Sequence, residues 1–431
     1  MKTIIYPESK DWDVLLERPT QTVEDIESTV VEIFNEVQHK GDEAIVKYTS
    51  LFDGVEFDNY KVTSAEIQNA IPEISDDLKQ AITLAKNNIE LFHNAQRTED
   101  VSVTTTEGVD CWQVKRPIQK VGLYIPGGTA PLFSTILMLA IPAKLAGCEE
   151  IVLCTPPRED GTVNPAILYT AQFCGVTKIF KVGGIQAIAA MTFGTQQVPQ
   201  VYKVFGPGNQ FVTVAKQLAT KFGVAIDMPA GPSELLVVAD DSANAAFVAS
   251  DLLSQAEHGV DSQVILVTTS KTMLDAVEKE VDAQLRTLPR KHIAEKAITN
   301  SKLILIKDDN TALRLINFYG PEHFIVCVQN EAFYVDGIVN AGSVFIGNYT
   351  PESAGDYASG TNHTLPTNGY AKQYSGVGLD SFLKRITFQK ISPQGIQNIG
   401  LAIEYMADAE GLQAHKNAVT LRLNQLNNTT K

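Results

Sequence analysis

The chain has 431 residues, 44% of them hydrophobic and 20% charged, and its formal net charge is −15. This length favours two or three domains, and the composition is typical of a globular protein with little disorder. The acidic balance, without any Lys/Arg-rich run in the sequence, excludes nucleic acid as an expected partner.

The amino terminus, Met1-Lys-Thr-Ile-Ile-Tyr-Pro-Glu, lacks the apolar core of a signal peptide. The longest apolar stretch, residues 130–143, is broken by Ser134, Thr135 and Pro142. It is too short to span a membrane and is expected to form a buried helix. We therefore expect a cytoplasmic protein without a membrane partner.

The five cysteines are an odd number without C-x-x-C spacing, which argues against a disulfide framework or a thiolate metal site. A catalytic thiol at Cys111, Cys148 or Cys174 is disfavoured, because none of them has a neighbouring basic group that would activate it.

Residues 1–22 are expected to form an N-terminal segment. Residues 23–120 are expected to form a helical section that packs with the second of two α/β domains, and helical spacing of apolar residues is clear from 23 to 96. Residues 121–232 then alternate strands with helices, which predicts a first α/β domain. Its expected strands are 121–125, 151–154, 178–182 and 201–205, and its expected helices are 134–146, 165–173, 186–191 and 211–222.

Residues 233–378 repeat this alternation and predict a second α/β domain, so two Rossmann-like parallel sheets in tandem are the simplest account. Residues 351–378 are a long polar segment read as a loop, and loops of that length are usually functional. Residues 379–431 are expected to form a helical C-terminal segment. In the second domain the expected strands are 235–238, 264–267, 303–306, 324–326 and 344–346, with a helix at 243–255.

Glycines follow three strands of the first domain, at Gly127-Gly128, Gly183-Gly184 and Gly206-Pro-Gly-Asn209. Each precedes an expected helix, and helix N-termini bind phosphate readily. No stretch is a full G-x-G-x-x-G, and Phe211 stands where the third glycine or alanine should be. The dinucleotide fingerprint is thus incomplete, and spacing alone leaves nucleotide binding open.

Four of the seven histidines lie in short polar stretches that also hold Gln, Asp or Glu. Imidazole with carboxylate or amide oxygen suits a borderline divalent metal such as zinc, and the same groups serve as general acids and bases. Singly, each also has an ordinary structural reading, such as a histidine that binds carbonyls at a helix end. The stretches are Gln255-Ala-Glu-His258, Pro321-Glu322-His323-Phe324, Asp356-Tyr-Ala-Ser-Gly-Thr-Asn-His363 and Glu410-Gly-Leu-Gln-Ala-His415.

Glu322 and His323 differ from the other groups because they are neighbours at the entry to an expected strand. Adjacent residues there point in different directions, which suits a base and a proton carrier better than a shared metal ligand.

These stretches and several others, in one order over nearly the whole chain, resemble the histidinol dehydrogenase family. The resemblance rests on Val121-Gly-Leu-Tyr-Ile-Pro-Gly-Gly-Thr-Ala-Pro-Leu132, Gly183-Gly-Ile-Gln-Ala-Ile-Ala-Ala190, Val204-Phe-Gly-Pro-Gly-Asn-Gln-Phe-Val212, Asp227-Met-Pro-Ala-Gly-Pro-Ser-Glu-Leu235, Leu252-Leu-Ser-Gln-Ala-Glu-His-Gly259, Gly320-Pro-Glu-His-Phe324 and Ala354-Gly-Asp-Tyr-Ala-Ser-Gly-Thr-Asn-His-Thr-Leu-Pro366.

The resemblance implies one zinc ion per subunit and a domain-swapped homodimer in which His415 reaches the site of the neighbouring subunit. It implies that Gln255, His258, Asp356 and His415 bind the zinc and that Glu322 and His323 have acid/base roles. The implied substrate contacts come from Ser233, His363 and Glu410, and also from His323 and the zinc ligands. The implied NAD contacts come from Tyr124, Gln186 and Asn209.

The implied activity is the oxidation of L-histidinol to L-histidine through bound histidinaldehyde, the final step of histidine biosynthesis. Removing four electrons requires two successive hydride transfers to two NAD molecules. His323 would take the hydroxyl proton and Glu322 would activate water, although the sequence leaves open which residue acts in which step. A zinc hydrolase and a noncatalytic assembly stapled by metal are the alternative readings.

Overall fold

The computed structural model describes residues 1–19, 23–57, 59–127, 130–229 and 231–429, so Gly128 of the first glycine pair lies outside the described residues. The chain divides into two compact units. The first comprises Met1–Gln96 and Ile118–Ser381, and the second comprises Arg97–Pro117 and Phe382–Lys431.

A five-stranded parallel sheet in the first unit has the order β6-β5-β4-β7-β8. Its central strands are buried on both faces, which explains their nearly continuous apolar sequence. The strands are β4 (Lys120–Tyr124), β5 (Glu150–Thr155), β6 (Lys178–Lys181), β7 (Lys203–Phe205) and β8 (Ala225–Ile226), and the helices between them are α6 (Phe133–Ala146), α7 (Pro165–Phe173), α8 (Gly184–Phe193) and α9 (Gln210–Lys221).

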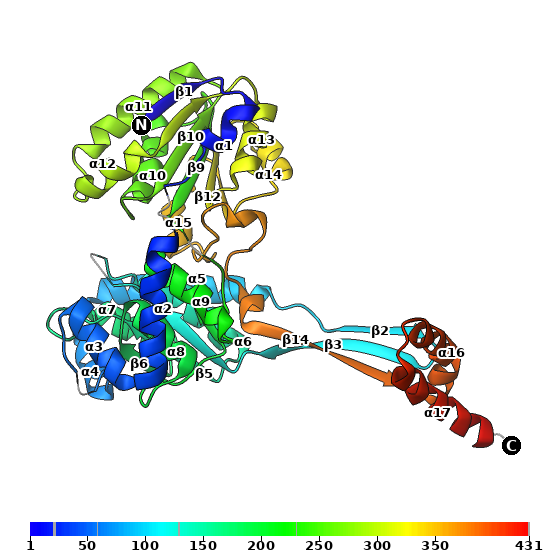
Figure 1. Cartoon of the computed structure of the whole chain (residues 1–431). Coiled ribbons are helices and arrows are strands. Elements are labelled where there is room, and N and C mark those ends of the chain that lie inside the picture. The colour runs from blue at the N-terminus through cyan, green and yellow to red at the C-terminus, as the bar shows by residue number, and fades with distance from the viewer. Residues whose placement is uncertain (20–22, 58, 128–129, 230, 430–431) are drawn as a thin grey trace. The chain divides into compact units, whose positions relative to one another are not determined.

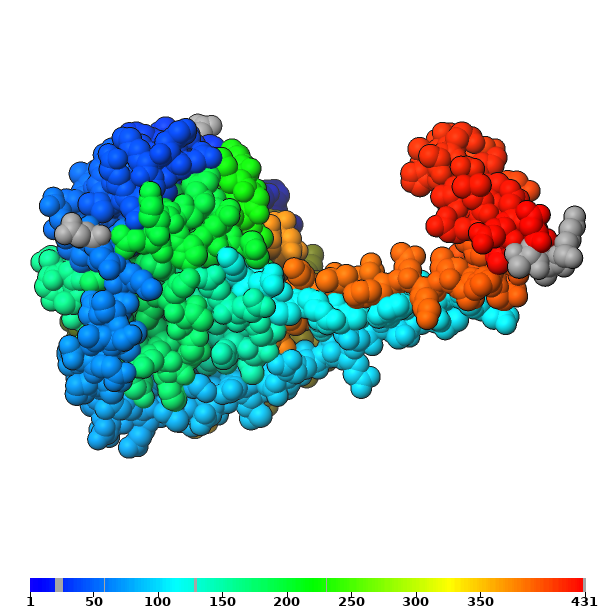
Figure 2. Space-filling model, turned by 90° about the horizontal axis from the view of Figure 1, so that it is seen from below, coloured from blue at the N-terminus to red at the C-terminus, as the bar shows by residue number. Residues whose placement is uncertain are grey.

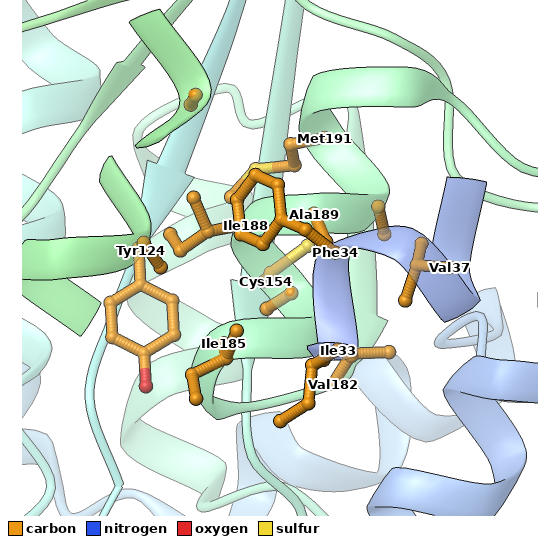
Figure 3. Close-up of a cluster of buried hydrophobic side chains, with 14 of the residues drawn as sticks. Ile33, Phe34, Val37, Tyr124, Cys154, Val182, Ile185, Ile188, Ala189 and Met191 are labelled. Atoms are coloured by element: carbon orange, nitrogen blue, oxygen red, sulfur yellow. The ribbon is translucent and has the colours of Figure 1, made fainter. Parts of the chain in front are cut away.

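The N-terminal helices cover this same sheet, through contacts of α2 and α3 with α8, of α4 with α7 and of α5 with α6. Figure 3 shows Ile33 and Phe34 of α2 in one cluster with Ile188 of α8. The expectation that the helical section packs with the second α/β domain is therefore wrong. The physical reason is that α8 is buried along its length, so its face away from the sheet must also pack against apolar residues. The N-terminal helices are α2 (Val23–Lys40), α3 (Asp42–Asp53), α4 (Ser64–Ala70) and α5 (Asp76–Ala95), with a 3₁₀ turn at Ile71–Glu73.

A six-stranded parallel sheet follows, in the order β1-β11-β10-β9-β12-β13. Without β1, it repeats the third-second-first-fourth-fifth order of the first sheet, so the prediction of tandem α/β sheets is confirmed (Figure 1). The N-terminal segment supplies β1, an edge strand that the sequence analysis did not foresee. The strands are β1 (Lys2–Ile5), β9 (Glu234–Ala239), β10 (Gln263–Thr268), β11 (Lys302–Leu305), β12 (His323–Cys327) and β13 (Ser343–Ile346).

Helices cover both faces of this second sheet and bury two apolar clusters against it. One face carries α10 (Ala245–Ala256), α11 (Lys271–Leu285) and α12 (Lys291–Thr299), and the other carries α1 (Trp12–Leu15), α13 (Asp309–Tyr319) and α14 (Glu331–Gly337). A 3₁₀ turn at Ser9–Asp11 precedes α1.

The long polar segment after β13 contains a short helix, α15 (Glu352–Tyr357). Asp356 therefore lies on a helix and not in a loop, whereas His363 follows in irregular structure. The reason is local, because Pro351 stands at the N-cap and an acidic residue occupies the first turn. Two 3₁₀ turns follow, at Tyr370–Lys372 and Leu379–Phe382.

The second unit is an antiparallel sheet of order β14-β3-β2 that continues into a pair of packed helices. Figure 1 shows β2 and β3 in cyan beside β14 in orange, and Figure 2 shows the cyan and orange residues in contact. Residues 101–106, 109–117 and 383–391 thus form strands, whereas helical segments were expected there. The pairing of β14 with β3 is long-range, so the local sequence carries no signal for it. Trp112 stacks on Phe388 across the sheet, with 5.4 Å between ring centroids. The elements are β2 (Val101–Thr106), β3 (Val109–Pro117), β14 (Leu383–Ile391), α16 (Pro393–Ala409) and α17 (Gln413–Thr429).

Among the described residues, no helix combines the length and the apolar character needed to cross a membrane.

Candidate functional site

A cavity of about 800 Å³ in the first unit is lined by residues from both parallel sheets. The five-stranded sheet contributes the carboxyl ends of its strands, with Tyr124 at the end of β4 and Asn209 after β7. The six-stranded sheet contributes the opposite edge, with Ser233 before β9 and Glu322 before β12. Ligands of parallel α/β sheets usually bind at the carboxyl ends of the strands, and the five-stranded sheet presents this edge to the cavity. The cavity therefore combines an edge suited to a cofactor with polar groups from the six-stranded sheet.

Glu322 and His323 are both held by the backbone of Glu234 on the neighbouring strand. The Glu234 N–H donates to Glu322 Oε2 at 2.8 Å, and His323 Nδ1 lies 3.3 Å from the Glu234 carbonyl oxygen. A carbonyl oxygen only accepts, so Nδ1 carries the hydrogen and Nε2 is left as an acceptor. His323 Nε2 is buried and has no hydrogen-bond partner among the described residues, which leaves it free to take a proton.

Burial acts on both members of this pair. It raises the pKa of Glu322 well above its usual value, and the nearby Glu234 and Asp356 carboxylates raise it further. Burial also lowers the pKa of His323 to about 3. The imidazole of His323 is therefore neutral near pH 7 and can act as a base. The ionised form of the Glu322 carboxyl group is disfavoured by burial and by the negative charges nearby.

A cluster of donor groups lies beside the pair. One ligand atom each from His323, Glu352 and Asp356 lies within 4.8 Å of the others. Glu352 and Asp356 are four residues apart on α15, so they share one face of the helix. Burial raises the pKa of Asp356 to about 7 and raises that of Glu352 well above its usual value. A divalent cation would offset this gathering of buried acidic groups.

The expected zinc ligands fall in two places. Gln255, His258 and Asp356 all line the cavity, with Gln255 buried on α10 and His258 exposed just beyond that helix. Amide, imidazole and carboxylate donors without a thiolate fit zinc or a similar divalent metal, and one chain's first unit supplies three of the four.

Glu410 and His415 lie in the second unit, Glu410 at the C-cap of α16 and His415 in the first turn of α17, and both are exposed. Within the first unit the structure therefore brings together the other expected zinc ligands, the acid/base pair, Ser233 and His363, but not these two residues.

His363 is fixed through both ring nitrogens. Nδ1 donates to the Asp356 carbonyl oxygen at 2.9 Å, which leaves Nε2 to accept from the Thr135 hydroxyl at 3.1 Å. Burial lowers its pKa to about 4, so the ring is neutral. In the sequence, Thr135 was noted only as a polar residue that interrupts an apolar helix. It could have been recognised as a candidate site residue, because a buried polar side chain needs a hydrogen-bond partner.

The expected NAD contacts lie around the carboxyl edge of the five-stranded sheet. The Tyr124 hydroxyl accepts from the Gly184 N–H at 3.0 Å, and Asn209 caps α9 by accepting from the Val212 N–H at 3.1 Å. Gln186 is buried on α8 and does not line the cavity, but its amide has no hydrogen-bond partner among the described residues. The N-terminus of α9 lies at the cavity, and helix N-termini suit a phosphate group.

Gly206, before α9, requires a glycine for two reasons. Its φ is +126°, and an added Cβ would lie 2.1 Å from the Tyr124 carbonyl oxygen. The turn after β7 thus approaches β4 closely at Tyr124, and both Tyr124 and Asn209 line the cavity.

Sequence reasoning missed Glu352, although the signal was present. Pro351 followed by an acidic residue is a helix start, and the spacing of four to Asp356 then predicts a shared helical face. Reading this segment as a loop removed that inference.

Comparison with known proteins shows the family to which the chain belongs. The model of the family described as histidinol dehydrogenase matches residues 16–423. The histidinol dehydrogenase of Bacteroides thetaiotaomicron is 62% identical over 99% of this chain and 100% of its own length. That of Campylobacter jejuni is 51% identical over 99% and 100%. The crystal structure of histidinol dehydrogenase from Elizabethkingia anophelis superposes with a TM-score of 0.97, at 56% identity and 99% coverage of both chains. The chain therefore belongs to the histidinol dehydrogenase family of NAD-dependent dehydrogenases.

Proposed function

We propose that this chain oxidises L-histidinol to L-histidine through a bound histidinaldehyde, with two NAD molecules as successive hydride acceptors, in the last step of histidine biosynthesis. The observation that carries the proposal is the pair formed by Glu322 and His323. Both are held by the peptide groups of Glu234, and both line the cavity that Tyr124 and Asn209 line from the other sheet.

Gln255, His258 and Asp356, together with His415 of the partner subunit, would hold one zinc ion. Bound there, zinc would anchor the nitrogen atoms of the substrate without redox chemistry of its own and would oppose the burial that disfavours ionised carboxyl groups nearby. The exposed position of His415 in a separate unit supports this shared arrangement, and with it a domain-swapped homodimer.

In the first oxidation His323 would accept the hydroxyl proton at Nε2 as hydride leaves the carbon for NAD. The neutral ring and the fixed tautomer support this role, because the accepting nitrogen is set before substrate arrives. Two electrons leave with the hydride, and the alcohol becomes the aldehyde.

The second oxidation requires water. Glu322 would take a proton from the water that adds to the aldehyde carbon, and His323 would return the proton gained in the first oxidation to the aldehyde oxygen, which gives the hydrate and a neutral imidazole. His323 would then accept a hydroxyl proton of the hydrate while the second hydride leaves, and the product is the carboxylic acid. Ser233, His363 and Glu410 would bind the substrate, and Tyr124, Gln186 and Asn209 would contact NAD.

The test is absorbance at the NADH wavelength with purified protein, histidinol and NAD, with and without chelator. The expected result is two NADH per histidinol and loss of the signal after metal removal. A metal hydrolase or a noncatalytic assembly would produce no NADH, and either result would reject the proposal.

A further inference from the structure

The geometry points to Arg18 as a positioning residue for the catalytic pair. Arg18 belongs to the N-terminal segment and does not line the cavity that holds Glu322 and His323. Its side chain instead fixes Glu234, and the peptide groups of Glu234 hold both members of the pair. This inference rests on the proposed function and adds a residue to it.

The first link is a two-pronged ion pair. Arg18 Nη2 donates to Glu234 Oε2 at 2.9 Å, and Arg18 Nε donates to Glu234 Oε1. The side chains are only 15% and 1% exposed. Two parallel hydrogen bonds fix the direction of the carboxylate as well as neutralise it, which a point charge cannot do as well.

Arg18 itself sits in a formed recess. Its guanidinium lies 4.0 Å from the centroid of the Tyr319 ring, and Nη2 also donates to the Tyr319 carbonyl oxygen at 2.9 Å. The Tyr319 hydroxyl donates to Gln263 Oε1 at 2.9 Å, at the start of the adjacent strand β10. The Arg18 guanidinium is therefore held by groups at the same edge of the six-stranded sheet as Glu234, the residue whose position it fixes.

The second link is the position of Glu234 as the first residue of β9. Its side chain is fully buried, and apart from Arg18 its Oε1 accepts only the Asn368 N–H, at 2.6 Å, among the described contacts. A buried carboxylate without its cation must gain a proton or move toward water. Movement at the strand start would displace the N–H that binds Glu322 Oε2 and the carbonyl that sets the His323 tautomer.

The predicted consequence is a loss of rate without a matching loss of binding. Among the described residues, the expected zinc ligands Gln255, His258 and Asp356 make no hydrogen bond to Arg18, and the expected NAD contacts lie around the five-stranded sheet. Loss of Arg18 should therefore lower kcat, while the KM for NAD and the zinc content change little.

The experiment compares purified zinc-loaded Arg18→Met and Arg18→Lys with Arg314→Met. Arg314 is an exposed arginine on α13 whose side chain, among the described residues, donates to Thr311 alone, so it is the matched control. We measure kcat and KM with histidinol and with histidinaldehyde, zinc content, and the thermal midpoint. For Arg18→Met we expect kcat to fall roughly 10- to 100-fold on both substrates, with KM for NAD and zinc content within about twofold. Arg18→Lys should retain more activity, yet remain at least about fivefold below the control, because it keeps the charge without the fork.

Each outcome decides. If Arg314→Met does not oxidise histidinol, the proposed function fails and not this inference. If Arg314→Met is active and folded Arg18→Met has the same kcat, the positioning role is overturned. If Arg18→Met does not fold, Arg18→Lys decides alone: a reduced kcat at unchanged KM and zinc content supports the role, and an unchanged kcat rejects it.

Discussion

Lys216 and Asp227 form a buried ion pair that clamps Gly206 from both sides. Lys216 Nζ lies 2.5 Å from Asp227 Oδ1 and donates to the Gly206 carbonyl oxygen at 2.7 Å, while the Gly206 N–H donates to Asp227 Oδ2 at 2.8 Å. The pair therefore holds the turn that places Asn209 at the cavity.

We predict that Lys216→Met lowers the free energy of unfolding by about 3–5 kcal/mol, because it leaves a buried carboxylate without its cation. The displaced turn should also raise the KM for NAD by roughly tenfold, with a smaller change in the KM for histidinol. Lys221→Met on the same helix removes only an exposed pair with Glu27, so it should change stability by less than about 1 kcal/mol. Equal denaturant midpoints for the two variants would contradict the prediction.

His93 predicts a dependence of stability on pH that is separate from the catalytic pair. The ring is fully buried, its Nδ1 donates to the Ile89 carbonyl oxygen at 2.8 Å, and Asn362 Nδ2 lies 3.3 Å from its Nε2. Burial lowers the pKa of His93 below the usual value of 6.5. The unfolded chain therefore binds this proton first, and the stability present above pH 6.5 is lost as pH falls toward the folded pKa.

His93→Gln should flatten this dependence by up to about 1.4 kcal/mol per pH unit below pH 6.5. The measurement is urea unfolding between pH 7.5 and pH 5 in chelator, beside His39→Gln, which changes an exposed histidine on α2. Parallel curves for the two variants would show that His93 does not carry the effect.

A covalent route through cysteine is not expected. None of the five cysteines lines the cavity, and burial raises the pKa of the Cys148 thiol to about 12. Cys148→Ser should keep turnover within about twofold of the unsubstituted protein, and Cys111→Ser should do the same. A loss of about a thousandfold in a folded, zinc-loaded variant would require a thiohemiacetal intermediate.

Sequence patterns were sufficient for the features that are local. Strand patterns placed Tyr124 within one expected strand, Asn209 after another and the Glu322–His323 pair at the entry to a third, because the limits of a buried strand are marked in the chain itself. The pairing of β1 with β11 was not accessible, since a four-residue strand whose partner is 300 residues away has no local signal.

The same limit applies to the support of the site. Arg18 and Glu234 are 216 positions apart, and each alone reads as an ordinary charged residue. Only the fold shows that one is the cation for the other. The pattern of residue types thus predicts which groups react, whereas the groups that hold them appear only with the tertiary contacts.

The proposed site, shared between two subunits, predicts complementation between defective subunits. His258→Asn and His415→Asn should each be inactive, because each removes one zinc ligand. After subunit exchange, a mixed dimer has one site with both defects and one site with neither. Equimolar mixtures should therefore recover about a quarter of the unsubstituted activity. Background activity after exchange has been demonstrated would mean that His415 acts within its own chain.

In the proposed mechanism Glu322 and His323 act on different protons, and single-turnover kinetics of Glu322→Gln separate the two roles. Glu295→Gln, an exposed change on α12, serves as the control. With histidinol and excess NAD, the account predicts a first NADH formed at close to the control rate and a second slowed by about 10²–10⁴-fold, because only the aldehyde step requires water activation. Oxidation of supplied histidinaldehyde should be slowed by the same factor. Equal slowing of both NADH-forming steps would contradict the account.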